Sequence, residues 1–467
     1  MYFAQITRQD IGCAAYLAGS TDAGEAAVID PRIDMVDELI DLATREGLRI
    51  RFILETHNHA DHVSGHHQLA ARTGAVIAVH ELAGAAYPHQ PLHDGDILAL
   101  GEVRLRIIHT PGHRPEHISI AAIDTSRSND PWLVLTGDSL FIGDVARPDL
   151  AIPGVEGAEA LFHSLHQQLL TLPEGTMAYP AHVSGSLCGR VSNRMTGTTI
   201  GFERRFNPAL VIASQADFVR YMTESLPERP PNMARIVELN KGAEPPLVAR
   251  AAPLTPEEVR QRQGEGALVL DIRSDHTFVS GHIPGAISVP LDGGQFQNRV
   301  GLLIPPEQRL ILVADSDEQA ADAALALSVI GYTSIAGYLA GGIECWKQVG
   351  YAEVPLASIT VQQLREMQMN KASLQVLDVR EPSEWNEEHL EGALHIPFYR
   401  LAANANLLDR ERPIAVICGG GTRSIIASSV LHTQHITQVL NVTGGMDAWK
   451  AAHLPTVTEH MLTSGTY

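Results

Sequence analysis

Residues 57–62 contain three histidines and one aspartate, directly after the segment RFILET at 51–56. A neutral imidazole offers a nitrogen ligand near pH 7 and a carboxylate offers an anionic oxygen, so both suit a small transition-metal ion. Single histidines at strand ends are more often surface residues, but burying so many ionisable groups without a cation would leave a large desolvation cost. The stretch therefore predicts a metal site, with the candidate donors His57, His59, Asp61 and His62.

Three further donors stand downstream, namely His113, Asp138 and His182. Each follows a short segment that we expect to be a strand or turn, at the point where the chain enters a loop. We therefore expect them to belong to the same site as residues 57–62.

Length, composition and charge limit the class of protein. A chain of 467 residues suits about three domains, and its 45% hydrophobic and 19% charged residues describe an ordinary globular protein. No apolar run reaches membrane-spanning length and the start does not resemble a secretion signal, so we expect a cytoplasmic protein with no membrane partner. The formal net charge of -20 argues against nucleic acid as a partner, and four widely spaced cysteines fit free thiols.

The chain divides into three predicted domains. Residues 1–245 alternate short apolar strands with helical stretches, which predicts a layered α/β sandwich, and the segment KGAEPP at 241–246 is typical of a linker. After it the sequence repeats: LDIR at 270–273 recurs as LDVR at 377–380, and GGIECW at 341–346 recurs as GGMDAW at 444–449. We expect two copies of one α/β unit, at 252–354 and 358–467.

The second copy carries a candidate nucleophile, Cys418. It follows the apolar segment 413–417 and begins the loop of Gly419, Gly420, Gly421, Thr422 and Arg423, which runs into a predicted helix. Backbone N–H groups of the glycines, the helix N-terminus and the arginine would all favour a sulfur anion, either thiolate or persulfide. A packing cysteine is the alternative, but it has no use for such a loop.

This loop resembles that of a rhodanese domain, whose cysteine carries a sulfane sulfur between donors and thiophilic acceptors. In the first copy, Asp315 stands at the position of the cysteine and Ala320 at the position of the arginine. A carboxylate cannot carry a persulfide, so the first copy is similar to a degenerate rhodanese domain, and we expect it to act as a scaffold or interface.

The metal motif resembles the metallo-β-lactamase superfamily. The resemblance implies an αββα sandwich, followed here by two α/β rhodanese domains with parallel sheets. All seven positions that bind two zinc ions in the glyoxalase II type of hydrolase are present, which leaves a zinc-dependent thioester hydrolase with sulfur-carrier domains as the alternative function.

Residues 137–150 and 179–189, together with the domain order, are more similar to bacterial persulfide dioxygenases fused to rhodanese domains. That resemblance implies one Fe(II) per chain, rather than Zn, bound by His57, His113 and Asp138. The remaining donors would orient these ligands, line the pocket or form a second metal site; they are His59, Asp61, His62 and His182.

Four further residues are weaker candidates. Cys188 could receive or relay sulfur near the iron, although a buried bystander is an equally good interpretation. Arg147, Arg190 and Arg194 could bind the carboxylates of a peptide-like thiol, although surface charge is the default interpretation of an arginine.

These inferences predict a cytoplasmic enzyme that oxidises a low-molecular-weight thiol persulfide, such as glutathione persulfide, with O2 to sulfite and thiol. Rhodanese transfer at Cys418 would then form or use thiosulfate. The other alternative is a sulfur-binding or sensing protein with rhodanese docking modules. We expect a homo-oligomer, either a dimer or a tetramer.

Overall fold

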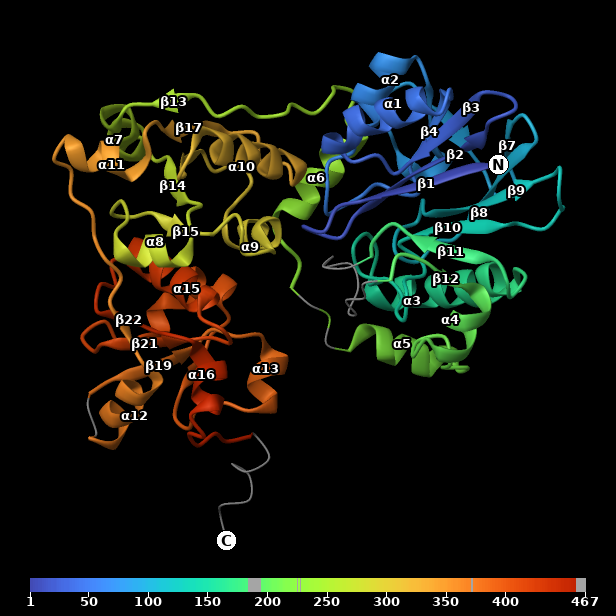
Figure 1. The fold of residues 1–467 in the computed structure, drawn as a ribbon. Coiled ribbons are helices and arrows are strands. Elements are labelled where there is room, and N and C mark those ends of the chain that lie inside the picture. The colour runs from blue at the N-terminus through green and yellow to red at the C-terminus, as the bar shows by residue number, and fades with distance from the viewer. Residues whose placement is uncertain (184–194, 225, 227, 371–372, 459–467) are drawn as a thin grey trace, which may run out of the picture. The chain divides into compact units, whose positions relative to one another are not determined.

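The computed structural model describes residues 1–183, 195–224, 226, 228–370 and 373–458 (Figure 1). The chain folds into two compact units. The first comprises Met1–Val248 with Ile304–Pro306 and Leu325–Thr333, and the second comprises the other residues from Ala249 onward. Both repeats of the sequence have their sheets in the second unit. Cys188, Arg190 and Arg194 lie outside the described residues.

Two six-stranded sheets form the first unit. The first sheet has the order β1-β2-β3-β4-β5-β6 and the second β12-β11-β10-β9-β8-β7. The strands of the first are β1 (Tyr2–Thr7), β2 (Ala14–Ser20), β3 (Glu25–Ile29), β4 (Arg49–Leu54), β5 (Val76–His80) and β6 (Gln90–Leu92). Those of the second are β7 (Ile97–Leu100), β8 (Val103–His109), β9 (Ile118–Asp124), β10 (Leu133–Gly137), β11 (Met177–Pro180) and β12 (Thr198–Thr199).

A shared core joins the two sheets. Tyr16, Ile29 and Leu54 of the first sheet pack in one buried cluster with Leu105 and Leu135 of the second. Burying such apolar faces against each other is the main favourable term in sheet packing, and the alternation of side chains along a strand leaves the other face of each sheet for helices.

Helices cover the outer faces of the two sheets. They are α1 (Val36–Arg45), α2 (His66–Thr73), α3 (Gly154–His163), α4 (Ile200–Phe206), α5 (Gln215–Thr223) and α6 (Asn232–Lys241). Leu161 of α3 and Phe218 of α5 are buried with Val134 of β10, on the face of the second sheet away from the shared core. The predicted αββα sandwich is therefore confirmed.

The second unit contains two parallel five-stranded sheets with the same strand order. These orders are β13-β17-β16-β14-β15 and β18-β22-β21-β19-β20. The first sheet consists of β13 (Pro253–Leu254), β14 (Leu268–Asp271), β15 (Ile287–Ser288), β16 (Leu310–Val313) and β17 (Ile335–Leu339). The second consists of β18 (Ser358–Ile359), β19 (Gln375–Asp378), β20 (Leu394–His395), β21 (Ile414–Ile417) and β22 (Val439–Val442). The sequence repeat is thus a repeat of topology, as predicted.

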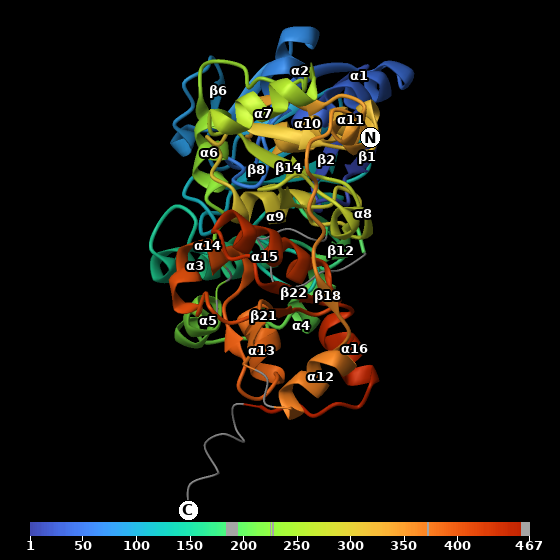
Figure 2. The ribbon, with the colours of Figure 1, turned by 90° about the vertical axis from the view of Figure 1, so that its left-hand side faces the viewer.

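Helices connect the strands of both parallel sheets. The first copy has α7 (Pro256–Gly264), α8 (Asp275–Ser280), α9 (Phe296–Leu303), α10 (Asp317–Val329) and α11 (Gly342–Gln348). The second copy has α12 (Val361–Met369), α13 (Pro382–Glu387), α14 (Leu401–Asn404), α15 (Thr422–Thr433) and α16 (Gly445–Ala451). In both views α15 lies on one face of the second parallel sheet, with α12 and α16 on the other (Figures 1 and 2).

The repeated LD-x-R motif is a buried ion pair at the end of the second strand of each copy. Arg273 Nη2 lies 2.6 Å from Asp271 Oδ2, and Arg380 Nη2 lies 2.7 Å from Asp378 Oδ2. Each arginine also donates to a backbone carbonyl eight residues on, at Gly281 or Glu388. The pair therefore fixes the same loop in both copies.

Among the described residues, none of the helices has the length and apolarity needed to cross a membrane.

Candidate metal centre and sulfur-carrier loop

His57, His113 and Asp138 come together at one end of the first unit. Asp138 Oδ2 lies 3.8 Å from His57 Nε2 and 3.6 Å from His113 Nε2. All three side chains are buried, and these three atoms have no hydrogen-bond partner among the described residues. Three buried, unpaired ligand atoms that point at one another leave a desolvation cost that a bound cation would remove. The residues present therefore fit a metal ion held by two histidines and one carboxylate.

The far side of each imidazole ring is held by a hydrogen bond. His57 Nδ1 lies 2.9 Å from Thr56 Oγ1, and His113 Nδ1 lies 3.0 Å from the carbonyl oxygen of Arg147. Since the Arg147 carbonyl can only accept, Nδ1 of His113 carries the proton and Nε2 keeps its lone pair toward Asp138. Burial, followed by the neighbouring imidazole of His59, holds the pKa of His57 well below its usual value. Burial also lowers the pKa of His113.

The turn after β10 delivers Asp138. Gly137 has φ of +50°, and a Cβ there would lie 2.5 Å from His117 Nε2, so only glycine fits. The next residue donates its backbone N–H to the same His117 nitrogen at 2.9 Å. Burial lowers the pKa of His117 to about 3, so its ring is a neutral acceptor. Strand β10, Gly137 and His117 together fix the position of the Asp138 backbone, from which the carboxylate extends.

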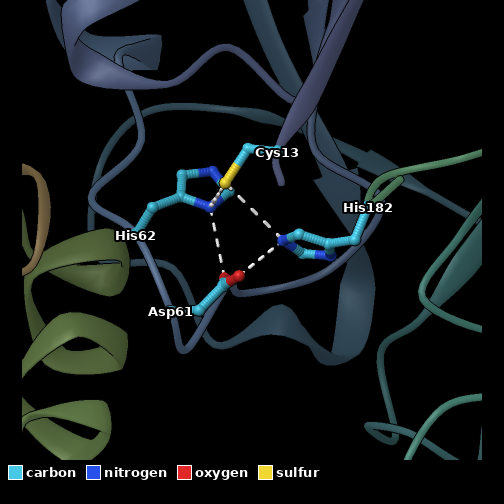
Figure 3. A group of neighbouring side chains, drawn as sticks. All are labelled: Cys13, Asp61, His62 and His182. Carbon is cyan, nitrogen blue, oxygen red and sulfur yellow. Dashed lines mark hydrogen bonds and ion pairs between the residues drawn. The ribbon is translucent and has the colours of Figure 1, made fainter. Parts of the chain in front are cut away.

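Figure 3 shows a second group of donors. It consists of Cys13, Asp61, His62 and His182, whose ligand atoms all lie within 4.8 Å of one another. Cys13 Sγ lies 3.4 Å from His62 Nδ1 and 3.6 Å from His182 Nε2. Asp61 Oδ2 lies 2.5 Å from His182 Nε2. His182 joins the two groups, because its Nδ1 lies 2.7 Å from Asp138 Oδ1.

Charges balance within this second group. Burial alone would lower the pKa of His62, but Cys13 and Asp61 raise it to about 10. Burial likewise opposes protonation of His182, whose pKa Asp138 and Asp61 raise well above its usual value. Burial opposes ionisation of Asp61, yet His182 and His62 hold its pKa well below the usual range. The histidines and the acidic groups of this cluster therefore stabilise each other's charged forms.

Sequence reasoning missed Cys13. From the sequence we expect Cys13 to be only one of four free thiols, because no ligand motif surrounds it. The structure brings it to the site through an isolated bridge between Cys13 and His182, extended by the backbone bond from Ala14 N to Ala181 O at 2.7 Å. Its position just before the fully buried strand β2 is the one local signal that could have drawn attention to it.

His59 belongs to a third buried group. Its Nε2 lies 3.1 Å from Asp30 Oδ1 and 3.5 Å from Glu55 Oε2, and its ring centroid lies 4.1 Å from that of His57. Asp30 also accepts from the backbone and hydroxyl of Thr56. This group therefore contacts Thr56, the residue before the predicted ligand His57, and its own His59 ring lies beside the His57 ring.

Arg147 lies beside the site with its guanidinium already paired. Its Nε and Nη2 lie 2.7 Å and 3.0 Å from the two carboxylate oxygens of Asp149. The side chain is 3% exposed. Its observed link to the metal centre is its backbone carbonyl, which accepts from His113. Substrate binding by Arg147 stays a prediction.

Cys418 stands between β21 and the N-terminus of α15. Its Sγ accepts from the backbone N–H of Gly421 at 3.1 Å, and the hydroxyl of Ser424 lies 3.5 Å away. The glycine pair at 341–342 in the first copy recurs as Gly444 and Gly445, and it lets the chain pack closely against the Cys418 loop. A Cβ on Gly445 would lie 2.3 Å from the carbonyl oxygen of Cys418. The loop thus turns a backbone N–H group toward the sulfur, a contact that favours an anion there.

Arg423 makes a two-point ion pair. Its Nη1 and Nη2 lie 2.5 Å and 2.7 Å from the two carboxylate oxygens of Glu384 in α13. Burial would lower the pKa of Arg423, but Glu384 and then Cys418 raise it, so the guanidinium stays charged next to the sulfur. In the first copy, Asp315 occupies the place of Cys418, between β16 and α10, and its backbone N–H donates to Gln319 at 2.7 Å.

The chain matches two family models. Residues 9–182 match the metallo-beta-lactamase superfamily, and residues 255–349 and 360–452 each match the rhodanese-like domain. It is 31% identical to the persulfide dioxygenase ETHE1 of Bos taurus over 44% of this chain and 74% of that protein. It is 30% identical to the Homo sapiens protein of that name, over 46% and 78%. A solved metallo-beta-lactamase from Staphylococcus aureus subsp. aureus COL is 30% identical, with a TM-score of 0.64 over 73% of this chain and 98% of that one.

Proposed function

This chain belongs to the persulfide dioxygenase family and carries two rhodanese-like domains, and we propose that it oxidises a low-molecular-weight thiol persulfide with O2 to sulfite and thiol at a centre formed by His57, His113 and Asp138. The observation that carries the proposal is the convergence of three buried, unpaired ligand atoms, two Nε2 and one Oδ2. Two imidazoles and one carboxylate are the donor set of non-haem Fe(II) oxygenases.

Bound Fe(II) would bind the persulfide sulfur and activate O2. The protein's own residues orient that centre. Thr56 and the Arg147 carbonyl hold the outer nitrogens of His57 and His113, and His182 holds the second oxygen of Asp138. Such partners fix ring orientation and carboxylate geometry. Burial of all three ligand side chains shields their donor atoms from bulk water.

Cys418 would carry sulfane sulfur in the last domain. Its thiolate attacks the outer sulfur of thiosulfate, the S–S bond of thiosulfate breaks, and sulfite leaves with the electron pair while a new S–S bond forms on Cys418. A thiolate or cyanide then takes the outer sulfur and regenerates the cysteine anion. In the opposite direction a persulfide donates sulfur to Cys418, and sulfite accepts it as thiosulfate. The Gly421 N–H and the charged Arg423 stabilise the anionic sulfur.

The test is metal content together with oxygen consumption. Protein purified without added metal should hold about one iron per chain. Glutathione persulfide should cause oxygen uptake in an oxygen electrode with sulfite as product. An iron-free protein that consumes no oxygen with any small-thiol persulfide would overturn the proposal.

A second candidate, a zinc-dependent thioester hydrolase, is favoured by one observation. The donor group of Cys13, Asp61, His62 and His182 could hold a second cation next to the first. Two zinc ions per chain, thioester cleavage and no oxygen uptake would select this candidate.

We further propose that the enzyme works in the cytoplasm as a homo-oligomer. The three cysteines in the described parts of the chain are free thiols, which fits a reducing compartment.

A further inference from the structure

The first rhodanese-like domain reaches the sulfur-carrier loop of the second, within the same compact unit. The hydroxyl of Thr422, in the loop that follows Cys418, donates to Oδ2 of Asp275 at 2.6 Å. Asp275 is the first residue of α8 in the first copy, and α8 contacts α15. The backbone N–H of Ser288 also donates to Ser429 on α15 at 3.1 Å. The copy in which Asp315 replaces the loop cysteine therefore forms part of the surroundings of Cys418.

Two polar atoms of the first copy are left unpaired there. Oδ1 of Asp275 and Nη1 of Arg299 are buried and have no hydrogen-bond partner among the described residues. Arg299 lies in α9, and its Nη1 would be 3.3 Å from a Cβ on Gly293, so the glycine leaves it room. An unpaired buried donor on a guanidinium costs free energy unless a ligand accepts from it.

The surroundings of Arg299 identify the kind of ligand. Its helix α9 contacts residues Phe398–Arg400 of the second copy. The charges of Asp275, Arg423 and Cys418 all act on its guanidinium. Burial and then Arg423 lower its pKa, while Asp275 and Cys418 raise it. Both Nη atoms of Arg423 are already paired with Glu384. Arg299 therefore has a donor left for an oxyanion, and the sulfonate group of thiosulfate is the oxyanion next to the sulfur that Cys418 would attack.

We infer that Arg299 binds the sulfonate oxygens of thiosulfate, and those of the sulfite that leaves, while Asp275 positions the Cys418 loop through Thr422. The inactive copy would then complete the active site of its neighbour instead of serving only as a scaffold. This inference rests on the proposed role of Cys418 as the sulfur carrier. The guanidinium neutralises part of the charge of the dianionic donor as it approaches the cysteine anion.

The first test measures thiosulfate:cyanide sulfur transfer with the full chain. Arg299→Gln should raise KM for thiosulfate about ten- to a hundredfold, the effect of losing one charge-assisted hydrogen bond, with a smaller change in kcat. Arg299→Lys should recover part of the loss. Arg309→Gln is the matched control, because Arg309 is an exposed arginine of the same domain, 4.0 Å from Glu265. With glutathione persulfide as donor, which has no sulfonate, KM should change little.

An unchanged KM for thiosulfate in Arg299→Gln, or a fall in kcat alone, would overturn the inference. Binding without turnover gives a second measurement: Cys418→Ser protein should bind sulfite in a calorimeter, and adding Arg299→Gln should weaken that binding. Unimpaired sulfite binding also counts against the inference. Circular dichroism and the denaturant unfolding midpoint show whether the rhodanese-like domains of each variant are folded. If Cys418→Ser itself keeps sulfur transfer, the proposed function of the loop fails, which is a different result.

The positioning role of Asp275 has its own test. Asp275→Ala removes the acceptor of the Thr422 hydroxyl and should lower kcat for sulfur transfer, whereas Asp275→Asn keeps a carbonyl acceptor and should restore most of it. Equal loss in both variants would mean that the charge of Asp275, and not its bond to the loop, is what matters, and would overturn the positioning role.

Discussion

His182 Nδ1 lies 2.7 Å from Oδ1 of Asp138, while the other oxygen of this carboxylate, Oδ2, has no hydrogen-bond partner among the described residues and faces His57 and His113. One carboxylate is therefore shared between a structural bond and the candidate metal centre. Its two oxygens have different surroundings, and this difference predicts different outcomes for substitutions of the histidines on either side of it.

Removing a predicted ligand should remove the metal. His113→Ala deletes one of the three converging atoms, so we expect loss of iron and of oxygen uptake, while thiosulfate:cyanide transfer at Cys418 continues. Metal analysis and an oxygen electrode measure the first two, and thiocyanate formation measures the third. Full iron content in this variant would contradict the assignment of His113.

Removing the supporting histidine should have a graded effect. His182→Ala leaves all three predicted ligands but frees Oδ1 of Asp138, and the loss of such a partner weakens metal binding by about 10- to 100-fold. We expect iron that is retained on purification but lost more readily to a chelator than in the unaltered protein. A complete absence of iron, equal to that of His113→Ala, would instead make His182 a ligand.

Most of this site could be predicted from the sequence alone, and the failures have a physical pattern. His57, His113 and Asp138 could be grouped with the other donors because each follows a predicted strand or turn, and the resemblance to persulfide dioxygenases singled them out as ligands. Cys13 could not, because its neighbours in space come from residues 61–62 and 182, and a single cysteine before a strand has no periodic or motif signal. Only the folded chain brings Cys13 to the site, through the isolated bridge to His182.

The same limit applies to the second unit. The fold could be predicted because the repeat fixes two copies of one topology, and Cys418 because glycines and an arginine follow it. Asp275 and Arg299 had no signal, since they lie in the copy where Asp315 replaces the cysteine. Residues that act on a neighbouring domain are identified only when the packing of that domain is known.

Cys13 should tune the metal centre without holding the metal. Cys13→Ser replaces a sulfur that contacts His62 and His182 with a shorter hydroxyl, so His182 should hold Asp138 less firmly. We expect about one iron per chain and oxygen uptake lowered about tenfold or less, because the change is one contact further from the ligands than His182. Cys345→Ser, in α11, is the control. Loss of one of two bound metals would support the hydrolase candidate instead.

The two chemical centres should be separable. Cys418→Ser removes the anion that carries sulfur, so thiosulfate formation and use should both be abolished. Oxygen uptake with glutathione persulfide should stay near that of the unaltered enzyme, because every residue of the metal centre is in the first unit. A parallel collapse of oxygen uptake would mean that the persulfide reaches the metal centre only through Cys418.

The buried pair of Arg380 and Asp378 should stabilise the last domain strongly. Arg380→Ala leaves Asp378 fully buried without its cation and also removes the donor to the Glu388 carbonyl. Leaving a buried charge unpaired costs about 3–5 kcal/mol, so we expect earlier unfolding of this domain in denaturant and loss of sulfur transfer with it. Arg410→Ala, at an exposed arginine of the last domain, is the control and should leave the unfolding midpoint nearly unchanged. If the unfolding midpoint of Arg380→Ala were no lower than that of this control, the buried ion pair would not stabilise the last domain.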